Sequence, residues 1–334
     1  MPGAGPHPGG CGLRVSRRPG NAPSRPRGEG DGAPAPASAA APRRGRPLGP
    51  RPRGEPARSP EEGRVSEADL PRSAAGGDAI DTARQCARVA RDLIRAAASH
   101  ADVTGVKGRG NVVTATDLAV ERAVITILHE HFPGHAILSE ETASATPTDG
   151  WTWVIDPLDG TKNFSRGIAH FAFTLALCLD GEPLLGLTTH PLLGLEVVAI
   201  AGGGCTVDGR RAILRPCPTV ADAVVAMDLG YDADRARRQL ELAAYLWPGM
   251  QSLRIPGSAA LGFAGLAAGW WDVYLHSDLQ PWDLAAGLLI VREAGGVVLT
   301  RDGTPAALTS RAVIAGSGTA VRDALARAGE LPVT

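Results

Sequence analysis

The sequence has little lysine, little cysteine, few aromatic residues and no long apolar run. Lysine occurs only at Lys107 and Lys162, so arginine supplies nearly all of the positive charge. The five cysteines are odd in number and lack CxxC spacing, which argues against a disulfide framework and against zinc bound by cysteine. No stretch approaches the roughly 18 apolar residues of a membrane helix, and the opening MPGAGPHPGG lacks the apolar core of a signal peptide. We therefore expect a cytoplasmic protein without a membrane segment.

The first 75 residues differ in composition from the rest of the chain. They are built of Pro, Gly, Ala and Arg with almost no large apolar side chain, so they cannot bury enough surface to offset the entropy of ordering. We expect a disordered extension over residues 1–75. An arginine-rich tail can hold nucleic acid, but its composition favours a neutral extension, and we regard nucleic-acid binding as unlikely. Its acidic residues, such as Glu29 and Glu55, argue against a transit peptide.

Residues 76–334 have the composition of a globular protein and are long enough for one large domain, or for halves at about 76–200 and 201–334. Apolar periodicity predicts helices over 78–99, 117–132 (with Thr116 as N-cap), 234–246, 257–269 and 282–296. It predicts strands over 135–139, 151–155, 171–179, 183–190, 195–201, 223–230, 251–255 and 271–276. Helices and strands mix without strict alternation, which predicts a layered α+β sandwich.

The segment WVIDPLDGTKNF, residues 153–164, places two aspartates at the end of an apolar strand. Asp156 precedes a proline, so it must be extended and should end its strand, and Gly160 permits a tight turn after Asp159. Two adjacent carboxylates repel each other unless a cation lies between them, and hard oxygen ligands suit Mg²⁺. The alternative is a pair of exposed turn aspartates. An EF-hand loop is excluded, because DPLDGT lacks oxygen ligands at alternate positions.

Other acidic residues occupy similar places. Glu140 and Glu141 follow a short strand, and Asp283 lies in the first turn of a predicted helix. Taken singly, a glutamate pair is usually solvated, and Asp283 can simply complement a helix dipole. Taken together with a Gly-Thr turn, they indicate a two-metal phosphate site.

Three segments in this order and at this separation resemble the signature of the inositol monophosphatase family of metal-dependent sugar phosphatases: LSEE, DPLDGTKNF and PWDLAAG. VTATDLAVE, GGGCTVDGRR and GSAAL support the resemblance, which covers about residues 78–330. It implies an αβαβα sandwich, a phosphoric monoester hydrolase and a homodimer. It also implies two or three Mg²⁺ ions in each active site.

The resemblance assigns roles to individual residues. One Mg²⁺ is expected on Glu140, Asp156 and the carbonyl of Leu158, and a second on Asp156, Asp159 and Asp283. Thr161 and Asp117, with Glu140, are expected to orient or deprotonate the water that attacks phosphorus in line. Substrate contacts are expected from Gly160, Thr161, Ser258, Ala259, His276 and Asp283.

The chain departs from the family pattern at two places. Ser139 replaces a glycine, which keeps the residue small. His276 stands where inositol-specific members carry a glutamate that touches the sugar hydroxyls, with Asp278 two residues later. Hydroxyl contacts decide substrate preference, so this difference leaves phosphate hydrolysis untouched but weakens the case for inositol.

Several functions therefore stay open at this stage. Myo-inositol 1-phosphate is the default substrate, and histidinol phosphate, fructose 1,6-bisphosphate and a 3′-phosphonucleotide are alternatives. The alternatives of another class are a non-catalytic binding or regulatory member of the family, and a nucleic-acid binder acting through the basic tail.

Overall fold

The computed structural model describes residues 70–98, 103–108, 111–142 and 149–329. All but the last six residues of the expected extension, and the side chain of Lys107, lie outside the described residues. Leu70 is buried at the start of the described part.

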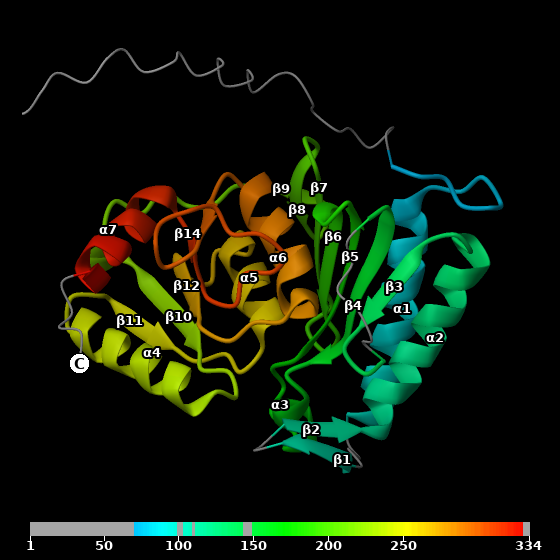
Figure 1. Ribbon diagram of the computed structural model, residues 1–334, viewed down its shortest axis with the longest axis horizontal. Coiled ribbons are helices and arrows are strands. Elements are labelled where there is room, and N and C mark those ends of the chain that lie inside the picture. Colours follow the sequence, from blue (N-terminus) through cyan, green and yellow to red (C-terminus); the bar gives the residue numbers. More distant parts are fainter. Residues whose placement is uncertain (1–69, 99–102, 109–110, 143–148, 330–334) are drawn as a thin grey trace, which may run out of the picture. The chain divides into compact units, whose positions relative to one another are not determined.

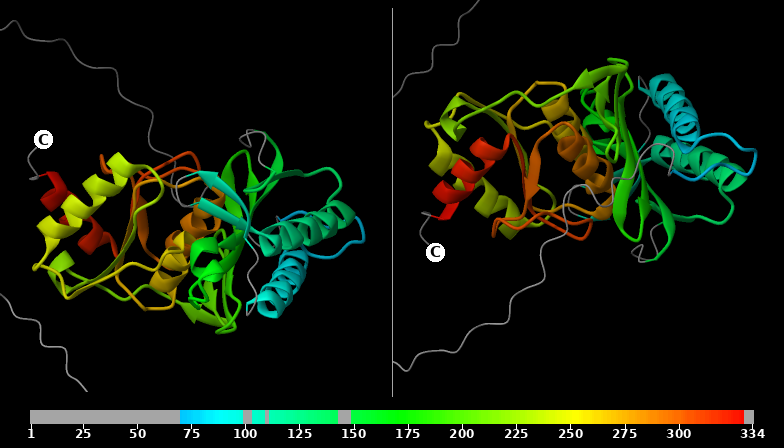
Figure 2. Two further views of the ribbon diagram at one scale, coloured as in Figure 1. Left: turned by 90° about the horizontal axis from the view of Figure 1, so that it is seen from below. Right: turned by 90° about the horizontal axis from the view of Figure 1, so that it is seen from above.

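A seven-stranded sheet forms the larger of the two main sheets (Figure 1). Its strands follow the order of the chain, and all neighbours are antiparallel except the first pair, which is parallel. They are β3 (Ala136–Ser139), β4 (Trp151–Asp159), β5 (Ala172–Leu179), β6 (Glu182–His190), β7 (Leu195–Ile200), β8 (Gly204–Val207) and β9 (Arg210–Ala212). Helices α1 (Ala79–Ala97) and α2 (Ala115–His131) cover one face of this sheet (Figure 2).

The other face of the large sheet packs against α5 (Ala259–Ala267) and α6 (Pro281–Glu293). These two helices also pack against a five-stranded sheet. Its spatial order is β11 (Ser252–Arg254), β10 (Val224–Asp228), β12 (Val273–His276), β14 (Val313–Gly316) and β13 (Val297–Leu299). Helices α4 (Ala233–Leu246) and α7 (Gly318–Gly329) cover its outer face. The layers therefore run αβαβα, and the expected layered α+β fold is confirmed.

The central strands are apolar on both faces because helices cover both sides. Every residue of β5 except Leu179, and every residue of β6 except Glu182, is buried. Such continuous apolar runs give no alternation from which the inward face could be read. Helix α6 is likewise buried from Leu284 to Val291, since it lies between the two sheets.

Two predicted boundaries near the site were wrong. The N-cap of α2 is Thr114 rather than Thr116, because the Asp117 side chain accepts the Thr114 N–H at 2.9 Å in a capping box. Strand β4 does not end at Asp156 but continues to Asp159, with a break in register against β5 between the two aspartates. An irregularity of this kind re-aims side chains without ending the strand.

Some elements lie beyond those that periodicity predicted. Among them are the β1–β2 hairpin (Val103–Gly108 and Asn111–Thr114), the short strands β8 and β9, and β13, β14 and α7 in the last third of the fold. A short helix α3 (Thr161–Ser165) opens directly after the aspartate motif.

Candidate active site

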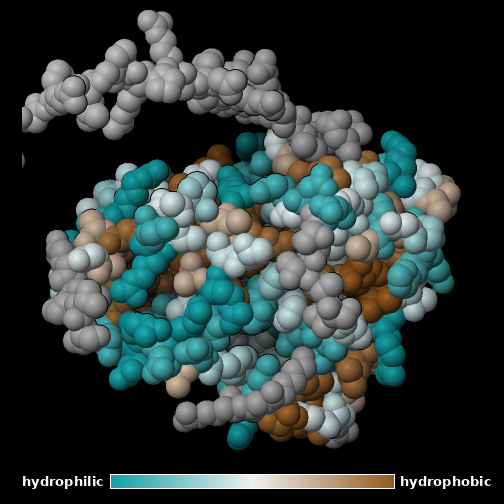
Figure 3. All heavy atoms as spheres, in the orientation of Figure 1, coloured by the Kyte–Doolittle hydropathy of each residue, from teal (hydrophilic) through white to brown (hydrophobic). Residues whose placement is uncertain are grey.

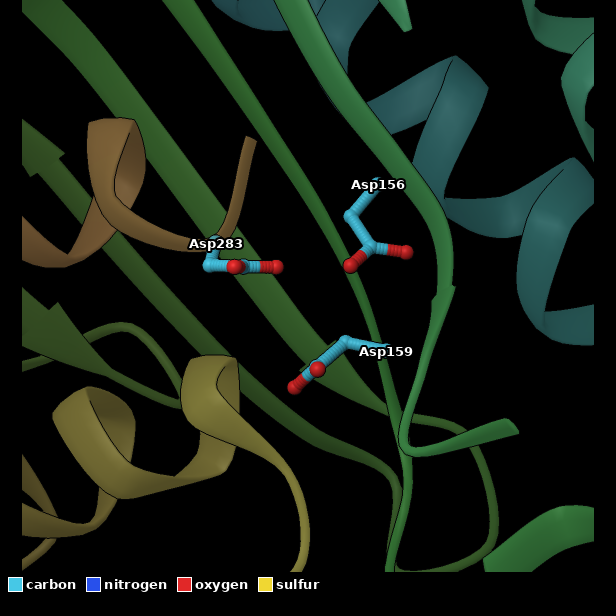
Figure 4. Close-up of side chains that lie close together, drawn as sticks. All are labelled: Asp156, Asp159 and Asp283. Carbon is cyan, nitrogen blue, oxygen red and sulfur yellow. The ribbon is translucent and has the colours of Figure 1, made fainter. Parts of the chain in front are cut away.

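Three aspartates from two distant segments meet where the large sheet faces the inner helices. Asp156 and Asp159 come from the end of β4, and Asp283 comes from the first turn of α6 (Figure 4). Each offers a carboxylate oxygen within 4.8 Å of the others. Asp156 and Asp159 are buried, and Asp283 is partly buried. In the sequence, Asp283 lies more than a hundred positions after the other two aspartates, and packing of α6 on the sheet brings it to them.

Backbone N–H groups hold one oxygen of each carboxylate in place. Asp156 Oδ1 accepts the N–H of Leu158 at 3.0 Å, and Asp159 Oδ2 accepts the N–H of Ala260 at 2.7 Å. Asp283 Oδ2 accepts the N–H of Gln280 at 2.7 Å, which also caps α6. These bonds fall on one oxygen of each aspartate, and each of the three residues can offer a carboxylate oxygen to a cation.

The electrostatics of the cluster favour a cation. Burial, then the charges of Glu140, Asp159 and Asp283, raises the pKa of Asp156 well above its ordinary value. Burial and neighbouring carboxylates raise the pKa of Asp283 in the same way, and burial raises that of Asp159. Among the described residues, no lysine or arginine forms an ion pair with any of these three carboxylates. Hard oxygen donors at this spacing, with unbalanced negative charge, fit Mg²⁺.

Glu140 also lies at the aspartate cluster, although it comes from another strand end. It follows β3 directly, where its backbone N–H bonds to the carbonyl of Ile155 at 3.3 Å. Its side chain lines the pocket, and its charge acts on Asp156 and Asp283. The parallel pairing of β3 with β4 thus carries the acidic residues of both strand ends to one edge.

Thr161 and Asp117 are in direct contact, although they come from the starts of different helices. The Thr161 hydroxyl lies 2.9 Å from Asp117 Oδ1 and 2.8 Å from the carbonyl oxygen of Leu158. Burial raises the pKa of Asp117, against the lowering effect of its hydrogen bonds with Thr114 and Thr161. The pair is therefore a hydroxyl and a buried carboxylate beside the aspartate cluster.

A pocket of about 690 Å³ opens beside the cluster. Seven of the predicted site residues line it: Glu140, Asp159, Gly160, Ser258, Ala259, His276 and Asp283. A hollow bordered mainly by hydrophilic residues is visible on the face of the molecule shown in Figure 3. Gly160 has φ +86° and lies so close to the carbonyls of Gly257 and His170 that a Cβ would approach each to 3.1 Å.

Comparison with known proteins agrees with this geometry. The model of the inositol monophosphatase family matches residues 78–330. The chain is 33% identical over 247 residues to inositol monophosphatase 2 of Solanum lycopersicum. The matched region covers 71% of this chain and 92% of that protein. The chain belongs to the inositol monophosphatase family. It is accordingly a phosphomonoesterase of that family, and the recognition from its three motifs is confirmed.

Other members of the inositol monophosphatase family are similar over most of the chain. The Nus factor SuhB of Pasteurella multocida is 32% identical over 250 residues, covering 74% of this chain and 94% of that protein. The solved structure of the IMPase from Thermotoga maritima superposes with a TM-score of 0.70 at 28% identity, covering 75% of this chain and 96% of that one.

Several pocket residues of this family member had no signal in its sequence. Tyr231, Ile255 and Trp282 line the pocket, as does Asp228, which is buried at the end of β10. Only Trp282, next to Asp283 in PWDLAAG, lay within a segment that the motifs singled out. Within the described part of the chain, no helix has both the length and the apolar character needed to cross a bilayer.

Proposed function

We propose that this chain hydrolyses a small phosphate monoester of an alcohol in a Mg²⁺-dependent reaction, with water attacking phosphorus in line. The observation that carries the proposal is the set of three carboxylates within 4.8 Å of one another, raised in pKa and lacking a cationic partner among the described residues. The default substrate for comparison is myo-inositol 1-phosphate, which the names of relatives such as inositol monophosphatase 2 support.

Each acidic residue has a proposed part in holding the cations. We assign one Mg²⁺ to Glu140, Asp156 and the Leu158 carbonyl, and another to Asp156, Asp159 and Asp283. When bound, Mg²⁺ lowers the pKa of water and neutralises charge on the phosphoryl oxygens.

The attacking water is oriented by Thr161. The Thr161 hydroxyl can accept a hydrogen bond from this water while donating its own proton to Asp117 Oδ1, which lies 2.9 Å away. Asp117 is suited to take up a proton, since burial raises its pKa. The backbone N–H groups of Gly160 and Thr161 are proposed to receive phosphoryl oxygens, where they stabilise the charge that develops in the transition state.

The first test is the change Asp156→Asn, with phosphate release measured on myo-inositol 1-phosphate and methyl phosphate. We expect kcat/KM to fall by at least about 10²–10³-fold, because an amide removes the charge shared by the cluster. Chelation with EDTA should abolish wild-type activity, and added Mg²⁺ should restore it.

A matched control is Asp92→Asn, which removes an exposed carboxylate that pairs with Arg91 on the surface of α1. This variant should keep wild-type rates. Unchanged activity in Asp156→Asn, or full activity in EDTA, would contradict the proposed role of the cluster.

A further inference from the structure

Part of the pocket wall beside the carboxylate cluster carries aromatic side chains. The pocket walls here come from the loop after β10, the end of β12 and the first turn of α6, which contribute Tyr231, His276 and Trp282. Ile255 adds a further apolar side chain, and Tyr231 and Ile255 are 50% and 55% exposed. If phosphate binds at the cluster, the alcohol part of the ester must lie along these walls.

Two polar side chains in this region already bond to the protein. Asn163 uses its side-chain N–H groups on the carbonyls of His170 and Pro256, at 2.7 and 2.9 Å. Asp228 accepts the N–H of Gly257 at 2.6 Å and the hydroxyl of Tyr274 at 2.9 Å. A polyol that enters here has these groups less available to replace the water on its hydroxyls.

Asp278 is occupied in the same way. One of its oxygens accepts the backbone N–H groups of Tyr231 and Asp232, at 3.2 and 3.1 Å, and the other pairs with Arg311. Asp278 therefore holds the loop that carries Tyr231, and its carboxylate is not presented to a substrate as an unengaged acceptor.

His276 differs, because one of its ring nitrogens is available to a ligand, and the hydrogen bond on the other nitrogen shows that the available one is a donor. The backbone N–H of Asp278 donates to His276 Nδ1 at 3.1 Å, so Nδ1 must carry the lone pair. Burial lowers the pKa of His276 to about 4, so the ring is neutral near pH 7 and its proton is on Nε2. Nε2 has no protein partner among the described residues, yet it is not closed off from solvent, and the ring lines the pocket.

This chain therefore carries a donor at the position where, by the resemblance, inositol-specific members carry a glutamate acceptor. A substrate hydroxyl that accepts a hydrogen bond from Nε2–H is itself a donor, so it needs a second acceptor in the pocket. A ring nitrogen or a carbonyl oxygen is an acceptor alone and needs no second partner. Lys162 is the one lysine or arginine among the described pocket-lining residues, and its Nζ lies 5.0 Å from the centroid of the Tyr231 ring. A second phosphate group has only this cation to face, so the pocket favours a monophosphate.

Building on the proposed phosphatase function, we infer that the preferred substrate is the phosphate monoester of an alcohol with a planar ring bearing a hydrogen-bond acceptor. The ring lies against Tyr231 and Trp282, and the acceptor receives the Nε2–H of His276. His276 acts as a specificity residue for the alcohol and takes no part in cleaving the ester.

Four kinds of phosphate ester test this inference on the wild-type chain with Mg²⁺. They are the pyridylmethyl phosphates (2-, 3- and 4-isomers, flat with a ring-nitrogen acceptor), benzyl phosphate (flat without one), myo-inositol 1-phosphate (polyhydroxyl) and methyl phosphate (no group that reaches the walls). We expect kcat/KM for at least one pyridylmethyl isomer to exceed that for benzyl phosphate and for myo-inositol 1-phosphate by about tenfold or more.

The outcomes separate the two proposals. Hydrolysis of methyl phosphate with no preference for any pyridylmethyl isomer overturns the inference and leaves the phosphatase function standing. Failure to hydrolyse any of the probes overturns the proposed function, and the inference with it.

Variants of His276 test whether this residue causes the preference for the pyridylmethyl phosphates. His276→Leu removes the donor, so the ratio of kcat/KM for the best pyridylmethyl isomer to that for benzyl phosphate should fall to near one. His276→Gln keeps an N–H donor and should retain most of this ratio. His276→Glu replaces the donor by an acceptor, so it should lower this ratio and raise kcat/KM for myo-inositol 1-phosphate relative to the pyridylmethyl phosphates. A ratio unchanged in both His276→Leu and His276→Glu contradicts the assignment. Since the probe series needs no variant, a variant that fails to fold leaves the inference testable.

Discussion

At the scale of single residues, the hydroxyl of Thr161 has one proton and two neighbouring acceptors, Asp117 Oδ1 and the carbonyl of Leu158. We predict that Thr161→Val, which keeps the shape but loses the hydroxyl, lowers kcat by about 10²–10⁴-fold. Thr161→Ser keeps the hydroxyl and should remain within about tenfold of the wild type. Steady-state phosphate release compares the two variants, and equal rates for valine and serine would exclude a role for the hydroxyl.

A second residue-scale prediction concerns Asp228 and pH. Burial raises the pKa of Asp228 from its ordinary value of 3.8 to about 7, so the folded state binds a proton that the unfolded state has released. The folded pKa lies above the unfolded one, so this contribution to stability is complete below about pH 4 and is lost as pH rises through about 7. A change of this size in pKa corresponds to about 4 kcal/mol.

The measurement is urea unfolding of the wild type and of Asp228→Asn between pH 5 and 8, at one concentration of EDTA. Both proteins share every other carboxylate, so the difference between their unfolding free energies isolates Asp228. Wild-type stability should fall relative to the variant as pH rises. A difference that is independent of pH would show that Asp228 is ionised throughout the range.

At the scale of elements, the starts of four helices meet at the site. Asp117 lies in the first turn of α2, Thr161 begins α3, Ala259 begins α5 and Asp283 lies in the first turn of α6. The N-terminal ends of helices carry partial positive charge and unpaired N–H groups, which offset part of the negative charge of the carboxylates. The fold thus supports an acidic cluster before any cation binds.

The geometry of the loop between β10 and α4 depends on a glycine. Gly230 has φ +68°, and a Cβ there would lie 2.4 Å from the Cβ of Asp278. We predict that Gly230→Ala costs about 2–4 kcal/mol, from a left-handed backbone together with overpacking, and displaces Tyr231. Thermal unfolding and kcat/KM on the pyridylmethyl phosphates measure the two effects.

Gly181→Ala provides the control for this prediction. Gly181 has φ +83° in the turn between β5 and β6, but a Cβ there meets no atom within 4 Å. Gly181→Ala should lower the free energy of unfolding by only about 1–2 kcal/mol and leave the kinetics unchanged. Equal losses of stability in both alanine variants would show that contact with Asp278 adds nothing.

At the scale of the whole molecule, α5 and α6 belong to the cores of both sheets. The large sheet also extends past residue 200, because β8 and β9 pair onto β7. We predict that residues 70–334 unfold in one cooperative transition, with calorimetric and van't Hoff enthalpies that agree. Differential scanning calorimetry in the presence of Mg²⁺ tests this, and two resolved transitions would indicate independent halves.

The expected homodimer and cytoplasmic location stay predictions.

The sequence predicted the parts of the site that depend on short range. Asp156 and Asp159 lie three residues apart in one strand, so the sequence alone places them close together. Most helices and strands could be predicted from the spacing of apolar residues. The β4 boundary and the N-cap of α2 were wrong, because a register break against β5 and a side-chain contact from Asp117 decided them. Tyr231 and Asp228 had no signal, since their neighbours come from other segments of the chain.

What the sequence by itself determined is the chemistry that is available: acidic residues at the ends of strands and helices, in motifs specific enough to identify the family. What only the tertiary structure decided is which of these groups meet and which are still able to bind a ligand. Asp278 and His276 look equally suited to bind substrate in the sequence, yet Asp278 is engaged by Arg311 and two backbone N–H groups, and His276 keeps Nε2 open. The physical reason is that a hydrogen-bonding group already satisfied by the protein gains little from a ligand, and only packing of the layers determines which groups are satisfied.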